Sequence, residues 1–327
     1  MKKLIIVAIC IAALGAAMFW FLASHEIKKV SVPASVSVAP APPKTPAAPK
    51  VQSPIRHVLG SSVQGRQIES YTFGNGYTQL VFVGGIHGGY EWNTVILAYD
   101  LIDYLDQNPG FVPKDQSITV IPDANPDAVY RIVGKDGRFG IADVPAGSNA
   151  SGRLNADKVD LNRNFDCDWK STGTWQNTTV SAGTAPFSEP ESTAIKNFVL
   201  EYRPAGVVFW HSQAGAVYSS NCDATATPET LAITKAYANA SGYQALTTFD
   251  QYEVSGDATD WLASIGIPAL TVELKTHNTI EWEQNLAGII FNSIKSIPAS
   301  SKILWASDSI FCLISSKIMP IVLESLL

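Results

Sequence analysis

Short apolar runs alternate with segments of helical periodicity along residues 55–298 of this 327-residue chain. The runs predicted to be strands are IESYTF, QLVFVGGI, SITVIPDANPD (which ends in turn residues), AGVVFWHS and PALTVEL. The segments predicted to be helices are 91–105, 188–202, 258–266 and 281–297. Buried strands that alternate with helices are typical of an α/β domain. We therefore expect a single domain with a central, mostly parallel or mixed, twisted sheet flanked by helices.

Two local signals add detail to this expectation. Asn75-Gly76 lies between the first two predicted strands, and this dipeptide is a strong signal for a hairpin turn. Ser188 and Glu191 have the spacing of a capping box at the start of helix 188–202. The sequence thus predicts a hairpin after the first strand and a side-chain cap on this helix.

The N-terminus predicts export. Lys2 and Lys3 precede an almost unbroken apolar run from Leu4 to Ala23, which at about 20 residues can cross a bilayer. We assign residues 1–24 to a signal or membrane anchor; an uncleaved anchor is favoured because signal peptides have shorter apolar cores, and a cleaved signal is the alternative. Either form places the rest of the chain outside the cytoplasm, in the periplasm or at the cell surface, as a membrane-anchored or secreted protein.

Residues 25–53 and 299–327 flank the predicted domain. The first segment is rich in Pro, Ala and Val, a composition that favours extended polyproline II and is typical of a spacer. The domain itself is assigned to residues 54–298. The segment 299–327 is apolar but interrupted by charges and a proline, and we assign it no role.

Charge and cysteine spacing exclude two classes of function. The formal net charge is −6, and no block of lysine or arginine indicates a nucleic-acid partner. The four cysteines form no CxxC pattern, which argues against a structural zinc knuckle.

Two histidines follow predicted strands at the positions where α/β proteins place ligand groups. His87 follows QLVFVGG, with Glu91 four residues later, and His211 ends the run AGVVFWH. A single histidine is more often a structural residue. Two histidines and a carboxylate, however, are the three-ligand set of a catalytic zinc site that leaves a fourth position open for water.

Two further segments carry polar groups in unusual places. Asn162 and Arg163 belong to the dense polar cluster DLNRNFD, and arginine is suited to bidentate recognition of a carboxylate; a turn with a surface salt bridge is the alternative. Glu273 interrupts the apolar run PALTVEL, where a carboxylate is costly to bury unless it is paired or catalytic. An outward-facing edge residue is the other interpretation of Glu273.

Taken together and in order, these segments resemble the zinc carboxypeptidases, the funnelin metallopeptidases. The resemblance extends from about Leu59 to Ile290, and the compact bacterial members that cleave murein peptides are closest in size. It rests on the segments LGSSVQGRQI, GGIHGGYEW, NPD, RLNADKVDLNRNFD, PFSEPES, FWHS, YEVSGDATDW and TVEL.

The resemblance implies a fold like that of the zinc carboxypeptidases and one Zn²⁺ per chain. His87, Glu91 and His211 match the zinc ligands, and Glu273 matches the general acid/base. Asp160 matches a carboxylate that orients a zinc-bound histidine.

The same resemblance implies the substrate-binding residues. Asn162 and Arg163 match the pair that binds the C-terminal carboxylate of a peptide, and Tyr252 matches the tyrosine that closes over the bound end residue. Arg153 is our choice for the arginine that stabilises the oxyanion, with Arg131 and Arg138 as alternatives.

The sequence departs from the family pattern at two places. The family spaces its first two ligands as His-x-x-Glu, whereas three residues separate His87 from Glu91, so we expect the adjacent glycines to absorb the extra residue. Thr259 occupies the position that lines the end-residue pocket, and it is neither acidic nor large and apolar. Asp257 is close in sequence and could favour a basic or zwitterionic end residue such as diaminopimelate.

Cys167 and Cys222 both lie close in sequence to the predicted site. In an oxidising compartment a disulfide between them is favoured over two free buried thiols.

The resemblance implies an exported carboxypeptidase that releases the C-terminal residue of peptides, with cell-wall peptides as candidate substrates. A deacylase of N-acyl amino acids from the aspartoacylase-like branch, or a catalytically inactive binding module, is the alternative. No nucleic-acid partner is expected; the membrane is a partner only through an uncleaved anchor.

Overall fold

A computed structural model of the chain describes residues 54–147, 150–222 and 225–295. The predicted anchor 1–24, the spacer 25–53 and the segment 299–327 lie outside the described residues. Among the residues that are described, no helix combines the length and apolar character needed to cross a bilayer.

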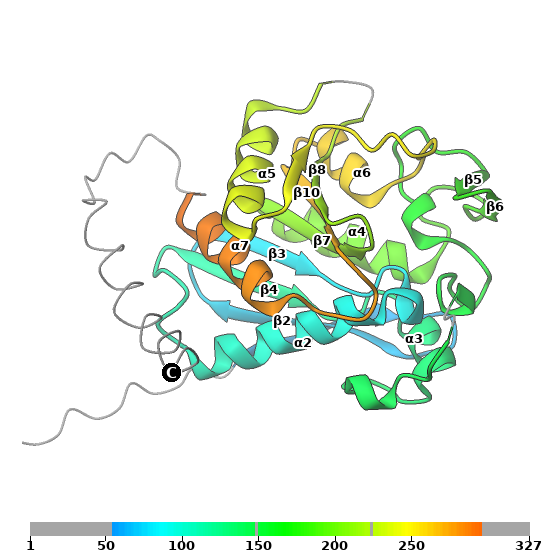
Figure 1. Ribbon diagram of the computed structural model, residues 1–327, viewed down its shortest axis with the longest axis horizontal. Coiled ribbons are helices and arrows are strands. Elements are labelled where there is room, and N and C mark those ends of the chain that lie inside the picture. Colours follow the sequence, from blue (N-terminus) through cyan, green and yellow to red (C-terminus); the bar gives the residue numbers. More distant parts are fainter. Residues whose placement is uncertain (1–53, 148–149, 223–224, 296–327) are drawn as a thin grey trace, which may run out of the picture. The chain divides into compact units, whose positions relative to one another are not determined.

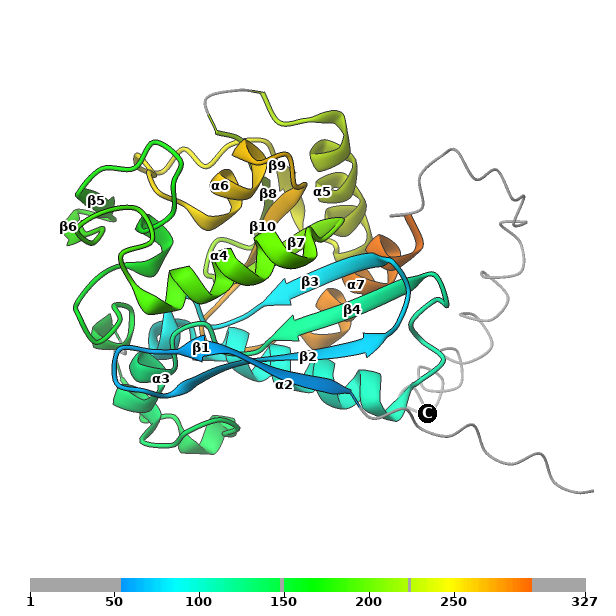
Figure 2. The same cartoon turned by 180° about the vertical axis from the view of Figure 1, so that it is seen from behind.

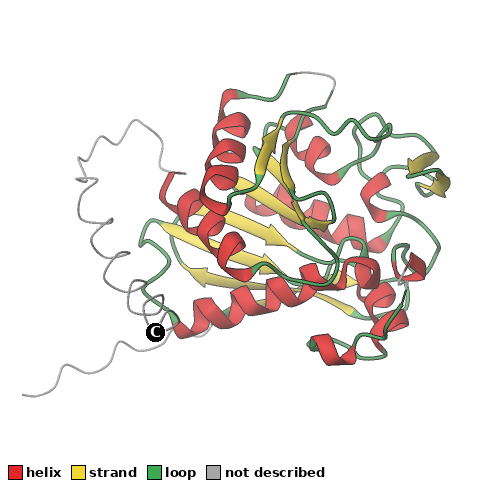
Figure 3. Cartoon of the chain, in the orientation of Figure 1, coloured by secondary structure: helices red, strands yellow, loops and turns green. Residues whose placement is uncertain are grey.

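An eight-stranded mixed sheet forms the centre of the fold, which confirms the predicted class (Figure 3). Its strands follow the spatial order β1 (Ile55–Ser61), β2 (Gln67–Gly74), β4 (Gln116–Ile121), β3 (Thr78–Val83), β7 (Gly206–Ser212), β10 (Ala269–Leu274), β8 (Ala216–Ser219) and β9 (Gln244–Leu246). Strands β4, β3, β7 and β10 are parallel to one another, so their carboxyl ends lie at one edge. A separate hairpin joins β5 (Thr172–Trp175) and β6 (Thr178–Ser181).

Helices cover both faces of the sheet. One face carries α2 (Trp92–Gln107), α5 (Pro228–Ser241) and α7 (Trp282–Lys295) (Figure 1). The other face carries α4 (Pro190–Tyr202) and α6 (Ala258–Ser264) (Figure 2). The short α3 (Pro126–Val133) follows β4.

Alternation along the strands explains why two cores form. In β3, Leu80 and Phe82 pack with the α2, α5 and α7 side, whereas Val81 and Val83 pack with the α4 and α6 side. Successive side chains of a strand point to opposite faces, so a continuous apolar run is required when helices cover both. This requirement is why the runs that predicted β3, β7 and β10 contain so few polar residues.

The predicted hairpin at Asn75-Gly76 is wrong. Strand β4 lies between β2 and β3, antiparallel to the first and parallel to the second. Gly76 instead allows the chain to pass close to the start of β4, where its N–H donates to the Gln116 carbonyl at 3.0 Å. A Cβ at this position would lie 2.0 Å from the carbonyl carbon of Asp115.

Gly76→Ala is therefore expected to destabilise the fold by roughly 1–3 kcal/mol, the usual cost of overpacking. The backbone of Asp115 and Gln116 cannot move without disturbing β4. Gly110→Ala is the matched control, because a Cβ there meets nothing within 4 Å. Urea denaturation of both variants measures the difference, and equal midpoints would contradict the assignment.

The predicted capping box on helix α4 is also wrong. The N-cap residue is Glu189, without a side-chain cap, and Pro190 begins the helix. The Ser188 hydroxyl donates to the adjacent Glu189 side chain. Glu191 accepts a hydrogen bond from the Val63 amide at 3.1 Å, and the Glu189 amide donates to the Asn164 side chain at 3.1 Å. Contacts with distant segments therefore replace the local cap.

Candidate metal centre and substrate pocket

Three side chains from separate elements converge beyond the parallel strand ends. His87 lies four residues after β3, Glu91 lies at the start of α2, and His211 lies in β7. All three are buried, with 2–4% of each residue exposed. Among the described residues they are the one group of His, Cys, Asp and Glu side chains whose geometry suits a metal ion.

The distances between the ligand atoms fit zinc. His87 Nδ1 lies 2.8 Å from Glu91 Oε1 and 3.2 Å from His211 Nδ1, which is 3.2 Å from Glu91 Oε2. In a tetrahedral zinc site with bonds of about 2.0 Å, ligand atoms are about 3.3 Å apart. Two facing imidazole nitrogens can share only one proton, so a cation between them satisfies both. The donor set therefore matches a catalytic zinc site.

The two glycines after His87 accommodate the additional residue before Glu91. Residues 88–91 form a single 3₁₀ turn, closed by the Tyr90 amide on the His87 carbonyl at 3.1 Å. Gly88 has φ +47°, and a Cβ there would lie 2.4 Å from the Ala128 Cβ. Only glycine fits this turn, and the turn places Glu91 against His87.

Asp160 and Arg153 lie on the side of His87 Nε2, the ring nitrogen that is not a proposed metal ligand. Asp160 Oδ1 lies 3.4 Å from His87 Nε2, and Arg153 donates to Asp160 Oδ2 through Nε at 2.9 Å and Nη2 at 2.8 Å. Burial alone would raise the pKa of Asp160, but Arg153, Arg163 and His87 hold it well below its usual range. Asp160 is thus an ionised acceptor that can fix the orientation of the His87 ring.

Glu273 lies beside His211 because β10 and β7 are parallel neighbours in which these two residues are in register. Burial, reinforced by the Glu91 charge, raises the pKa of Glu273 to about 7. Its Oε2 atom is buried and has no hydrogen-bond partner among the described residues. A carboxylate of this kind is suited to exchanging protons near neutral pH.

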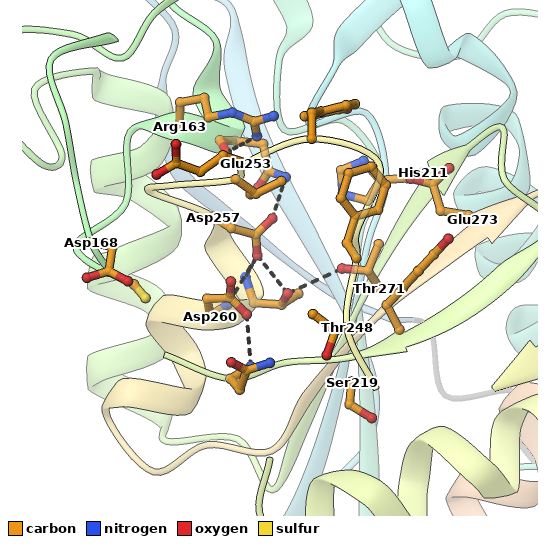
Figure 4. A pocket seen from close by; sticks show the side chains of 18 of the residues that line it. Arg163, Asp168, His211, Ser219, Thr248, Glu253, Asp257, Asp260, Thr271 and Glu273 are labelled. Carbon is orange, nitrogen blue, oxygen red and sulfur yellow. Dashed lines mark hydrogen bonds between the residues drawn. The ribbon is translucent and has the colours of Figure 1, made fainter. Parts of the chain in front are cut away.

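A cavity of about 370 Å³ opens beside these groups (Figure 4). It brings together predicted site residues from distant segments: His87, Arg153, Asn162, Arg163, His211, Tyr252, Thr259 and Glu273. The other two arginine candidates lie elsewhere. Arg131 donates to the carbonyls of Ser151, Leu154 and Asn155, and Arg138 pairs with Asp103 at the surface.

Arg163 is 2% exposed and lines the cavity. Its Nη1 donates to the Asn162 carbonyl at 2.7 Å, and its Nη2 donates to the Thr174 carbonyl at 2.9 Å. Each of these nitrogens has a second N–H, so the guanidinium remains able to bind a carboxylate. The Tyr252 ring centre lies 6.0 Å from its central carbon.

Asn162 and Thr259 are engaged with the start of helix α6. The Asn162 side chain donates to Asp257 Oδ2 at 2.7 Å and accepts from the Ala258 amide at 3.0 Å. The Thr259 hydroxyl bonds to Asp257 at 2.7 Å and lies 3.2 Å from the Thr271 hydroxyl. Both residues line the cavity, and these hydrogen bonds fix the positions of their side chains in its wall.

Sequence reasoning missed an aromatic cluster beside the metal centre. The Tyr90 ring lies 4.6 Å from that of His277 and 5.2 Å from that of Trp175, over which Arg153 stacks at 4.7 Å. His277 has its Nδ1 atom 2.6 Å from the Ser212 hydroxyl. The ring types are visible in the sequence, but nothing local indicates that they meet.

Cys167 and Cys222 form a disulfide with Cα atoms 5.9 Å apart, and Cys167 lines the cavity. The bond joins the segment after Arg163 to the segment after β8. In the chain-entropy model, a bridge that closes about 55 residues contributes about 4 kcal/mol of stability.

Denatured, unreduced protein is therefore expected to show no labelling by a thiol reagent at either cysteine. Reduction before labelling should expose both, and peptide mapping distinguishes them from Cys10 and Cys312. Labelling of Cys167 and Cys222 without reduction would rule the bond out.

Known proteins share both the sequence pattern and the fold. A family model described as zinc carboxypeptidase matches residues 52–304. Gamma-D-glutamyl-L-diamino acid endopeptidase 1 of Lysinibacillus sphaericus is 25% identical over 240 residues, which cover 66% of this chain and 59% of that protein. Carboxypeptidase O of Bos taurus is 32% identical over 138 residues, covering 37% of this chain and 36% of that protein.

Two solved structures show the same architecture. Murein-tripeptide amidase from Escherichia coli O157 aligns with a TM-score of 0.53 and 20% identity, covering 72% of this chain and 91% of that chain. Carboxypeptidase A from Helicoverpa armigera aligns with a TM-score of 0.57 and 19% identity, covering 75% and 67%.

Proposed function

This chain belongs to the zinc carboxypeptidase family, and on that premise we propose that it is an exported hydrolase that removes the C-terminal residue from peptides. The observation that carries the proposal is the convergence of His87, Glu91 and His211 next to Glu273 and a cavity lined by Arg163. We propose His87, Glu91 and His211 as the ligands of one zinc ion. Cell-wall peptides are the candidate substrates, in keeping with the diamino-acid peptidase and the murein amidase among its relatives.

Zinc bound by these ligands would supply an acidified water and polarise the scissile carbonyl. Glu273 would accept the water proton and pass it to the leaving amine, a role that fits its raised pKa. Arg153 would face the negative charge that develops on the carbonyl oxygen, and its Nη1 atom already lies 3.9 Å from Glu91. Arg163 would bind the terminal carboxylate, which makes the enzyme an exopeptidase.

The test is direct. The purified full chain is expected to contain about one zinc per chain and to release single C-terminal residues from peptides. Chelation should abolish release, and added zinc should restore it. Release from N-acyl amino acids alone would favour the deacylase, and zinc-free protein without any release would favour the binding module.

A further inference from the structure

A second cavity, of about 410 Å³, is bordered by the start of β2, helix α2, the segment that joins β4 to α3 and the segment after α3. None of the described residues that line it also lines the cavity beside the metal centre. Its volume lies within the range of small-molecule binding sites. The charged residues of its lining are three acids and one arginine: Glu69, Asp123, Asp136 and Arg66. The lining is therefore net negative and favours a cationic ligand over an anionic one.

Three of these four charged groups have partners within the protein. Arg66 donates to Asp127 through Nη1 at 2.8 Å and to Asp136 through Nε at 2.7 Å. Glu69 accepts a hydrogen bond from Arg56 Nε at 2.9 Å. The charges of Arg66, Glu69 and Asp136 are thus compensated without any ligand.

The remaining acid, Asp123, is buried, with 6% of the residue exposed. Its Oδ1 accepts from the Asn125 amide at 3.0 Å, whereas its Oδ2 has no hydrogen-bond partner in the described part of the chain. Burial raises the pKa of Asp123 to about 7, and the charge of Asp127 acts in the same direction. A buried carboxylate without a counter-charge is costly, and a cation bound beside it would remove that cost.

The Tyr99 hydroxyl is a second free polar group in the same cavity. Tyr99 lies on α2 with 8% of the residue exposed, and its oxygen bonds to no residue that the structure describes. Burial and the charge of Asp123 raise the pKa of this hydroxyl, so it stays neutral. An ammonium group has three donors and no acceptor, and it therefore suits a cavity that offers both a carboxylate oxygen and a hydroxyl oxygen.

We propose that this cavity is a second ligand-binding site, which takes a small organic cation with a primary ammonium group. One ammonium N–H would donate to Asp123 Oδ2 and another to the Tyr99 hydroxyl. Pro122 and Pro126, which also line the cavity, would contact the apolar part of the ligand. A metal ion is a poor fit, because the metal centre beyond β3 and β7 is the one group of described His, Cys, Asp and Glu side chains with suitable geometry.

The proposal is tested by calorimetric titration of the purified full chain with pentylammonium. At about pH 8 the Asp123 carboxyl is mostly ionised and the ammonium is charged. We expect a Kd of about 1 mM or below. Pentan-1-ol, which lacks the charge, and pentyltrimethylammonium, which keeps the charge but has no N–H, should each bind about tenfold more weakly. No binding of pentylammonium, or equal affinity for all three probes, would overturn the proposal.

Variants assign the binding to single groups. Asp123→Asn keeps an acceptor for the Asn125 amide but removes the charge, and it should weaken pentylammonium binding about tenfold. Tyr99→Phe removes the hydroxyl and should weaken binding about two- to tenfold. Asp136→Asn is the matched control, because this acid lines the same cavity but is exposed and paired with Arg66; it should bind like the wild type. Equal losses in Asp123→Asn and Asp136→Asn would indicate a general negative field and contradict the proposed site.

Asp260→Asn distinguishes the two cavities, because Asp260 lines the one beside the metal centre. This variant should bind pentylammonium like the wild type. Affinity that falls in Asp260→Asn but not in Asp123→Asn would place the ligand beside the metal centre and refute the second site. The comparison of the three probes uses the wild type alone, so it decides the matter even if a variant does not fold. Heat of binding is measured without turnover, so the result is independent of the proposed function.

Discussion

Glu273→Gln is expected to retain zinc and to lose about 10²- to 10⁴-fold in kcat/KM, the range that general acid–base catalysis contributes. Glutamine preserves the size of the side chain in β10, but it cannot accept the proton of a water. The loss should fall on kcat, because Glu273 is not one of the three proposed ligands and substrate binding involves other residues. KM should change little.

Zinc content by atomic emission, together with steady-state kinetics, separates this role from a structural one. Glu283→Gln, an exposed change on helix α7, is the control and should match the wild type. A Glu273→Gln enzyme with near-normal turnover would eliminate the acid/base assignment. Loss of zinc from the variant would instead show that the residue holds the metal.

The fold class and most elements could be predicted because the relevant signals are local. The strands β7 and β10 are continuous apolar runs, and the helix α2 has apolar residues on one face; each pattern follows directly from how the element is buried. Strand pairing could not be predicted in the same way. Asn75-Gly76 has the composition of a hairpin turn. The strand that pairs with β2, however, is β4, which begins some 40 residues later in the chain.

The residues of the candidate site also differ in whether local sequence signals predict them. His87 and His211 could be identified because each follows a buried strand, and the structure brings both to one edge with Glu91 and Glu273. Asp257 caps α6 through the amides of Thr259 and Asp260, which is a local contact. The Asn162 side chain that donates to its other oxygen comes from a distant segment. No spacing along the chain records the contact between Asp257 and Asn162, so it could not be predicted from the sequence.

Replacing Arg163 is expected to turn a strong requirement for a free C-terminus into a weak one. Arg163→Lys keeps the positive charge but loses the planar pair of donors, and kcat/KM for peptides with a free carboxylate should fall about 100-fold. Peptides with a C-terminal amide are already poor substrates for the wild type, because the amide offers no anion. The variant should cleave them no more slowly than the wild type does.

A thermodynamic cycle tests this prediction by combining the Arg163→Lys change in the enzyme with the carboxylate-to-amide change in the substrate and comparing kcat/KM for all four pairs. If Arg163 and the carboxylate act on each other, then changing both should cost about as much as changing either one, since each change removes the same interaction. Arg138→Lys, at the surface, is the control and should leave both rates unaltered. Independent, multiplying losses in the Arg163→Lys cycle would mean that the arginine only supports the fold around Gly173 and Thr174 and that another group binds the carboxylate.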